Sequence, residues 1–224
     1  MSRELKSLNQ RIISCKACPR LVNYRESTAR NKVKRFADWQ YWGRPLPGFG
    51  DPKAKLLIIG LAPAAHGGNR TGRMFTGDAS GDWLVKALYE TGFANQPTSV
   101  SASDGLQLKN AYITAAVKCA PPENKPTKAE IENCSLYLKG ELSILKEVKI
   151  VLALGRIAFD AYLQIIQPLR KPVFMHGSLN KLDDKLTLVA SYHPSRQNTQ
   201  TKRLTWDMWI NVFKRIKELI ELSN

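Results

Sequence analysis

The chain has 224 residues, 43% hydrophobic and 24% charged, which suits a single globular domain over residues 1–224. No apolar run reaches the roughly 20 residues that a membrane-spanning helix needs. The polar start "MSRELKSLNQ" also lacks the apolar core of a signal peptide. We therefore expect a cytoplasmic protein.

The charge is strongly unbalanced, with 34 Lys and Arg against 19 Asp and Glu and a formal net charge of +15. Such an excess favours a polyanionic partner, because bound cations on a nucleic acid are released when basic side chains replace them. The alternative is that the charge serves solubility alone. The composition favours a nucleic-acid partner over that alternative.

The four cysteines are widely spaced. Cys15 and Cys18 form a C-x-x-C pair after an N-terminal helical stretch, Cys119 follows an apolar run, and Cys134 lies in the next helical pattern. The pair places two thiolates within reach of one metal centre, and two distant cysteines complete four ligands. Zinc and an iron–sulfur cluster are both compatible with this set. The alternative is four unconnected core thiols.

The next segment, residues 25–52, lacks a periodic pattern and is predicted to be irregular. It begins with basic residues and then turns aromatic. The basic part, from Arg25 to Arg35, either contacts backbone phosphates or forms a solvated face.

Apolar runs and helical patterns alternate through the rest of the chain. Strands are predicted at Leu56–Gly60, Ala111–Val117, Ile150–Leu154 and Leu186–Ser191. Helices are predicted at about 80–92, from the capping-box sequence at Thr127 onward, at 156–166 and at about 204–222. This alternation predicts a parallel sheet covered on both faces, with functional loops at the carboxyl ends of the strands.

Two of those loops carry candidate chemistry. "GLAPAAHGGNRTGRMFTGD", residues 60–78, holds five glycines, which bring backbone close to a ligand or allow sharp turns. In it, Phe75 either stacks on a planar ring or plugs the loop, and Asp78 stands where it can cap a helix. His66 either hydrogen-bonds the loop or faces a ligand. His193, in the later loop, either donates a hydrogen bond to a leaving group or is structural.

These two loops resemble motifs A and B of the family-5 (type b) uracil-DNA glycosylases. "RPLPGFGDP", "AYITAAVKCAPPENKPT" and the cysteine pattern are also similar to that family, so the resemblance runs from Cys15 to Thr205. It implies a three-layer α/β/α fold around a central four-stranded parallel sheet. It also implies a [4Fe–4S] cluster held by the four cysteines.

The resemblance further implies residue roles in base flipping, in which a nucleotide leaves the helix and enters a pocket. Phe75 stacks on the uracil, Asn124 pairs with its edge, and backbone at Gly60 and Ala62 lines the pocket. His193 stabilises the charge that develops on uracil O2. These roles give the glycines of the first loop a reason, since bulky side chains would block the extruded base.

The position of the catalytic water is less defined, because "LAPA" at residues 61–64 has no side chain that can act as a base. Asp78 is the nearest carboxylate in the motif and our candidate for positioning the water. Asn69 and His66 are secondary candidates.

Motif B departs from its family pattern at one position, where Lys202 stands in place of a glycine. Lysine adopts positive φ less easily than glycine, so the loop conformation after Asn198 is an open question. Lys202 can instead contact a phosphate. Arg196 and Gln197 lie where related enzymes press a loop into the duplex.

The predicted function is hydrolysis of uracil, and of other deaminated bases such as hypoxanthine, from double-stranded DNA in base excision repair. One alternative is a non-catalytic nucleic-acid-binding module stabilised by its metal site. Another is an iron–sulfur nuclease, which the lack of an acidic cluster for divalent ions disfavours. We expect a monomer, with a sliding clamp as a possible partner.

Overall fold

A computed structural model describes residues 2–222 and contains one six-stranded sheet in the order β1-β3-β2-β4-β6-β5. The four central strands pair in parallel, which confirms the predicted four-stranded parallel core. They are β2 (Leu56–Gly60), β3 (Ala111–Ala115), β4 (Ile150–Leu154) and β6 (Thr187–Ser191). Two short antiparallel edge strands, β1 (Phe49–Gly50) and β5 (Leu179–Lys181), were not predicted.

The central strands are buried on both faces, as expected for near-continuous apolar runs in a parallel sheet. Alternate side chains enter two separate cores. Ile58 belongs to one core with residues of α4 (Ala79–Glu90) and α8 (Trp206–Leu222). Leu57 and Ile59 belong to the other, with residues of α1 (Arg3–Ile13), α5 (Lys128–Ile144) and α6 (Arg156–Ile166).

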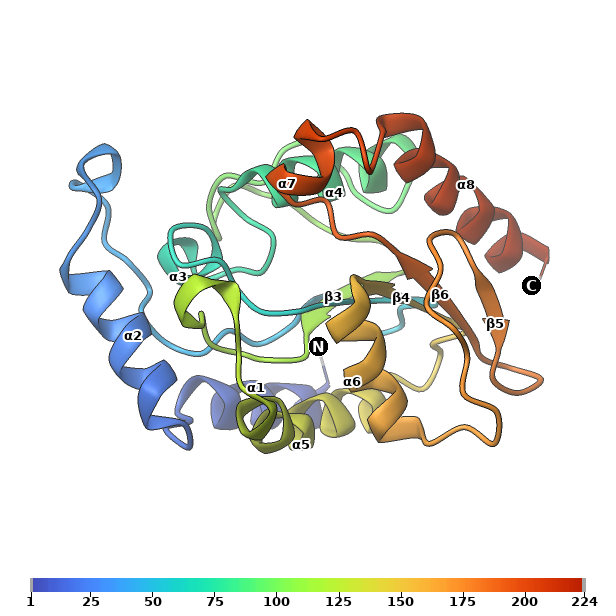
Figure 1. Cartoon of the computed structure of the whole chain (residues 1–224), viewed down its shortest axis with the longest axis horizontal. Coiled ribbons are helices and arrows are strands. Elements are labelled where there is room, and N and C mark those ends of the chain that lie inside the picture. The colour runs from blue at the N-terminus through green and yellow to red at the C-terminus, as the bar shows by residue number, and fades with distance from the viewer. Residues whose placement is uncertain (1, 223–224) are drawn as a thin grey trace.

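The helices therefore form a layer on each side of the sheet, and Figure 1 shows α4 and α8 on one side and α1, α5 and α6 on the other. This arrangement confirms the three-layer α/β/α prediction. Each helix turns an apolar stripe to the sheet, and the largest buried side chain among them is Trp209 of α8. None of the helices described between residues 2 and 222 combines the length and apolar content needed to cross a membrane.

Two local predictions have different outcomes. The capping box is confirmed, because Thr127 accepts from the Glu130 N–H and the Glu130 side chain accepts from the Thr127 N–H. The prediction of irregular structure from residue 25 was wrong for its first part, since α2 runs over Pro19–Arg30. Proline at the first helical position, which needs no N–H partner, begins this helix.

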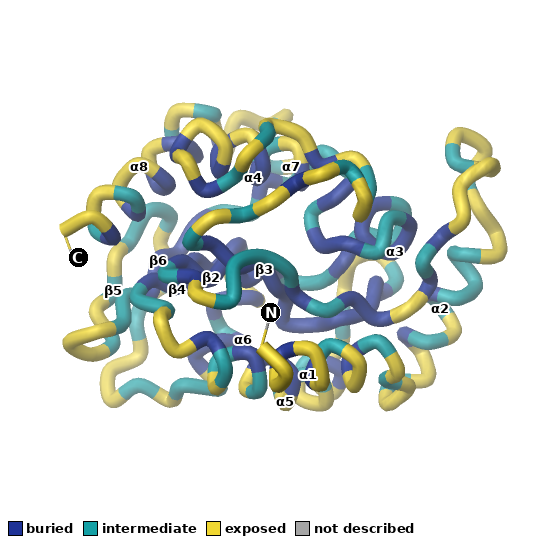
Figure 2. The backbone as a smooth tube through the Cα atoms, turned by 180° about the vertical axis from the view of Figure 1, so that it is seen from behind, coloured by how far each residue is buried: buried dark blue, intermediate teal, exposed yellow. Residues whose placement is uncertain are grey.

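Short helices connect the main elements at the carboxyl ends of the strands. They are α3 (Gly68–Thr71), the 3₁₀ turn η2 (Pro122–Asn124) and α7 (Arg196–Gln200); a further 3₁₀ turn, η1 (Lys34–Phe36), follows α2. Figure 2 shows that the strands are buried, whereas the loop after α2 is largely exposed.

Candidate functional site

The loops that follow the four parallel strands meet at one edge of the sheet. Beyond β2 and β3 the backbones continue to pair, with Ala116 N–H donating to Gly60 O at 2.9 Å and Val117 N–H to Leu61 O at 2.9 Å. Beyond β4 and β6, Gly155 N–H donates to Ser191 O at 2.8 Å. The predicted convergence of the polar loops is therefore confirmed, and it defines the candidate active site.

Phe75 and His193 bring the two predicted motifs together. Their ring centroids lie 6.0 Å apart with planes tilted by 31°. Phe75 has a φ of +49°, which turns its ring back over Gly60. A Cβ at Gly60 would lie 2.8 Å from two carbons of the Phe75 ring, so only glycine lets the aromatic ring settle on the end of β2.

The His193 ring lies in surroundings that keep it neutral. Burial lowers the pKa of its imidazole to about 4. The loop is fixed by Asn198, whose side-chain nitrogen donates to His193 O at 2.8 Å. At neutral pH one ring nitrogen therefore carries a proton that it can donate to an acceptor in the site without bringing a positive charge.

A stack of three side chains supports motif B from behind, and sequence reasoning missed it. His176 stacks on Tyr192 with ring centroids 5.0 Å apart. The guanidinium of Arg203, a residue of motif B, lies 4.8 Å from the centroid of the Tyr192 ring. The Nδ1 atom of His176 accepts from the Tyr192 N–H at 3.2 Å. This bond holds the backbone next to His193. A lone histidine in an irregular segment gives no sequence signal for this role.

Asp78 is both a helix cap and a buried carboxylate. Its Oδ1 accepts from the Gly81 N–H at 2.9 Å at the start of α4. The other oxygen faces Gly67, where a Cβ would lie only 2.0 Å from Oδ2. Burial raises the pKa of Asp78, and hydrogen bonds from the helix N-terminus and the charge of Arg70 oppose that shift. A raised pKa suits proton acceptance, so the geometry accommodates capping and chemistry together.

The two secondary candidates hold the loop in place. His66 Nδ1 lies 3.0 Å from the Tyr41 hydroxyl. Asn69 is fully buried, and its side-chain nitrogen donates to Arg25 O at 3.1 Å, so it ties the loop to α2. Its side-chain oxygen is buried without a hydrogen-bond partner among the described residues, and the expected roles of Asn69 and His66 toward substrate and water stay predictions.

Asn124 lies exposed at the end of η2 with its amide available. Glu123 and Asn124 both have positive φ, +53° and +57°. Such a pair of left-handed residues makes a tight turn, and Asn tolerates this conformation better than most residues. The backbone N–H of Asn124 donates to Pro121 O at 3.2 Å, whereas its side-chain amide has no hydrogen-bond partner within residues 2–222. Ala62, partly buried, packs beside Val117 and Cys119 and brings the β2 loop close to this segment.

The predicted DNA-contacting residues of motif B are exposed. Arg196 and Gln197 form the first turn of α7, which Ser195 caps by accepting from the Asn198 N–H at 3.4 Å. Lys202 has a φ of +58°, the conformation in which glycine is favoured. The loop therefore keeps a left-handed residue at this position despite the change to lysine.

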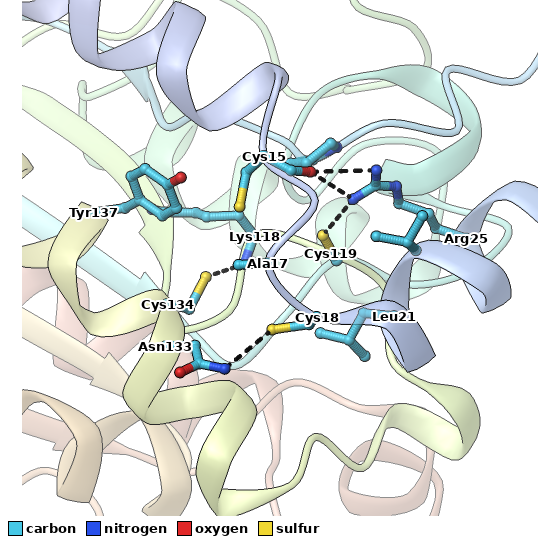
Figure 3. Close-up of a pocket in the computed structure, with 12 residues that line it drawn as sticks. Cys15, Ala17, Cys18, Leu21, Arg25, Lys118, Cys119, Asn133, Cys134 and Tyr137 are labelled. Carbon is cyan, nitrogen blue, oxygen red and sulfur yellow. Dashed lines mark hydrogen bonds between the residues drawn. The ribbon is translucent and has the colours of Figure 1, made fainter.

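All four cysteines line one small cavity. Figure 3 shows their sulfur atoms around a common space, drawn from the α1–α2 connection, the β3–η2 loop and α5. Within residues 2–222 no group of three or more His, Cys, Asp or Glu side chains is arranged to hold a metal ion. The four cysteines therefore lie around one cavity, and the metal-ligand role expected of them stays a prediction.

Hydrogen-bond donors surround the sulfur atoms. The Lys118 N–H donates to Cys134 Sγ at 3.2 Å, and the Asn133 amide to Cys18 Sγ at 3.7 Å. Burial raises the pKa of Cys134 to about 12. Nearby positive charge or a bound metal centre is therefore needed to hold this cysteine as a thiolate.

Arg25 supplies such a charge to Cys119 and corrects one prediction. Its Nη1 donates to Cys119 Sγ at 3.0 Å, and its side chain is only 3% exposed. The expectation that the basic segment contacts phosphates from Arg25 onward was wrong at this residue, because its guanidinium is buried against the cysteine cavity. Lys118 is likewise buried, with its Nζ 2.8 Å from Glu141.

These features agree with the comparisons to known proteins. The family model described as "Uracil DNA glycosylase superfamily" matches residues 47–217, which include both motifs and all the parallel strands. The chain is therefore a member of this superfamily.

Three relatives are similar over nearly the whole chain. A type-5 uracil-DNA glycosylase of Mycobacterium leprae is 49% identical over 218 residues, covering 96% of this chain and 95% of that protein. One of Thermus thermophilus is 49% identical over 215 residues, with coverage of 95% and 97%. One of Pyrobaculum aerophilum is 47% identical over 205 residues, with coverage of 92% and 88%. The chain belongs to the type-5 uracil-DNA glycosylases.

Proposed function

We propose that the protein hydrolyses the N-glycosidic bond of uracil in double-stranded DNA and leaves an abasic site. The observation that carries the proposal is the convergence of Gly60, Phe75 and His193 at the carboxyl edge of the sheet. An aromatic ring beside a neutral histidine forms a place for a flat, uncharged base. The net charge of +15 suits the polyanion that presents it.

The base is held by stacking and by hydrogen bonds. Phe75 offers a ring face to the flipped uracil, since its backbone turn fixes the ring over Gly60. Asn124 offers an exposed amide with one acceptor and two donor protons, which can read the edge of the base. Arg196, Gln197 and Lys202 contact the duplex around the vacated position.

Bond cleavage places negative charge on the departing base and positive charge on the sugar. His193, neutral because burial lowers its pKa to about 4, donates a hydrogen bond to uracil O2 and stabilises the leaving group. Asp78 positions the attacking water and accepts its proton, a role that its burial and raised pKa support. The water oxygen then bonds to C1′ as the C1′–N1 bond breaks.

We further propose that Cys15, Cys18, Cys119 and Cys134 hold a [4Fe–4S] cluster. Four thiols around one cavity, with N–H donors directed at the sulfur atoms of Cys18, Cys119 and Cys134, support it. When bound, the cluster supplies a cross-link between the N-terminal segment, the β3–η2 loop and α5. The chain's own residues carry out the hydrolysis.

Other deaminated bases, such as hypoxanthine, are proposed as additional substrates, because the Phe75 ring can stack on any flat base and the exposed side-chain amide of Asn124 offers both donors and an acceptor. A monomeric state, a cytoplasmic location and a sliding-clamp partner stay predictions of the sequence.

The test is base release from duplexes containing uracil opposite guanine, uracil opposite adenine, and hypoxanthine opposite thymine. The expected result is an alkali-labile abasic site in the uracil duplexes, with release greatly reduced in His193→Ala. A folded protein that binds DNA and leaves every base in place would favour the non-catalytic alternative. Strand cleavage without alkali would favour a nuclease.

A further inference from the structure

Residues 31–40, which we call the arm, project from the body of the molecule after α2. Figure 2 shows the arm as an exposed loop, and Figure 1 places it on the side of the sheet where α3 lies, which follows the carboxyl end of β2. Its basic residues are Lys32, Lys34 and Arg35, and its one acidic residue is Asp38. The arm is therefore a cationic projection beside the candidate active site.

Arg70 of the glycine-rich loop fixes the arm to that site. Its guanidinium carbon lies 3.8 Å from the ring centroid of Phe36 and 4.0 Å from that of Trp39. The same guanidinium donates to His66 O at 2.7 Å and to Gly77 O at 2.9 Å. Both aromatic residues of the arm thus pack against one arginine of motif A. These cation–π contacts stabilise a single conformation of an otherwise exposed loop.

The root of the arm is tied to the same loop through its backbone. The Trp42 N–H donates to Arg70 O at 3.0 Å, and the Gly43 N–H donates to Asn69 O at 3.1 Å. The Tyr41 hydroxyl adds its bond to His66. The arm and the loop that ends in Asp78 therefore form one rigid unit.

The arm's charges face solvent and are not neutralised by the protein. Lys32, Lys34 and Arg35 are exposed, and none of them has an ion-pair partner in the described chain from residue 2 to 222. Lys32 donates one hydrogen bond to Ala37 O at 3.2 Å, and Arg35 lies against the Phe36 ring at 4.2 Å. Both contacts orient the side chains and leave further N–H donors free for an anion.

We propose that the arm binds the phosphate backbone of duplex DNA beside the flipped nucleotide, through Lys32, Lys34 and Arg35. Phosphate contacts position a protein on DNA without reading its sequence. Because Arg70 joins the arm to motif A, binding there holds the pocket in register with the extruded base. This proposal rests on the proposed function and adds a second DNA-contacting surface, separate from motif B.

The test compares two triple variants that each remove three exposed positive charges. Lys32→Gln/Lys34→Gln/Arg35→Gln alters the arm. The control, Lys6→Gln/Lys139→Gln/Lys146→Gln, alters exposed lysines on α1, α5 and the turn after α5, none of which has an ion pair in the described residues. Affinity for an undamaged duplex is measured over a range of salt concentrations. Single-turnover release from a uracil duplex is measured with saturating enzyme.

We expect the arm variant to bind the undamaged duplex about tenfold more weakly than wild type, with a slope of log K against log salt reduced by about two to three. The control should change affinity by less than about twofold and should release uracil at the wild-type rate once saturated. Equal affinities and salt slopes in the two variants would overturn the proposal, since any loss would then reflect net charge alone. Failure of wild type to release uracil would refute the proposed function instead, because the binding comparison uses undamaged DNA.

Discussion

Asp78→Asn separates the two roles that the Asp78 carboxylate can play. Asparagine keeps an oxygen for the Gly81 N–H, 2.9 Å away in the wild type, and is as good a helix cap as aspartate. It loses the negative charge and the ability to take a proton. The substitution therefore changes the chemistry of the site and leaves its architecture nearly intact.

The expected effects on stability and rate have different magnitudes. Burial raises the pKa of Asp78, so the folded protein disfavours its charged form, and a neutral replacement relieves that cost. The free energy of unfolding of Asp78→Asn should thus stay within about 1 kcal/mol of wild type or increase, whereas Asp78→Ala should lose about 1 kcal/mol with the cap. Loss of a proton acceptor should slow uracil release by about 10²- to 10⁴-fold, or about 3 to 5 kcal/mol of barrier.

The assay is single-turnover uracil release with saturating enzyme, alongside urea unfolding of all three proteins. As the pH is lowered, the wild-type rate should begin to fall at a pH above the range in which an ordinary aspartate titrates. The reason is that the pKa of Asp78 is raised and its carboxylate must be ionised to accept a proton. Release by Asp78→Asn within about threefold of wild type would refute the reasoning and leave Asp78 as a helix cap alone. Asparagine and alanine variants with the same loss of stability would show that the cap argument is wrong.

Three further predictions concern the pocket and the cysteine cavity. Gly60→Ala should displace the Phe75 ring, cost about 1 to 3 kcal/mol in thermal unfolding and reduce uracil release, because the added Cβ would lie 2.8 Å from the ring; full activity would show that the ring moves freely. His193, with its pKa lowered to about 4, should keep its full contribution to stability above pH 6.5 and lose it as pH falls through about 4. Wild type should therefore lose up to about 3 kcal/mol more than His193→Gln between pH 7 and pH 4 in urea unfolding, and parallel losses would contradict this. Arg25→Met should lower the iron content of purified protein by removing the donor 3.0 Å from Cys119, and unchanged iron would show that the thiols need no such partner.

Strong periodic segments of the fold could be predicted from sequence, and short ones could not. The bounds of β2, β4 and α6 agree with prediction, because each is a continuous apolar or amphipathic segment. β1 has two residues and β5 has three, too few for a period to appear. Their pairing is set by the neighbouring parallel strands, which is a tertiary effect.

The site shows the same division between chemistry and placement. Residue types and motif order predicted that Phe75 and His193 serve one pocket, and their rings do lie together. The burial of Asn69 and Arg25 could not be predicted, because the local sequence around a polar residue does not show whether its side chain faces solvent or is buried against a distant segment. The support that His176 gives to motif B also depends on contacts between distant segments.

The attachment of α2 has a consequence for local opening of the protein. This helix buries only Leu21 and Arg25, and both side chains line the cysteine cavity. A helix with so few buried contacts forms a cooperative unit that can detach at a free energy well below that of global unfolding. The state of the thiols would then set how often α2 opens, while the sheet and its two cores stay folded. The rate of amide hydrogen exchange in residues 19–30 would depend more on the state of the four thiols than on the free energy of unfolding of the whole chain.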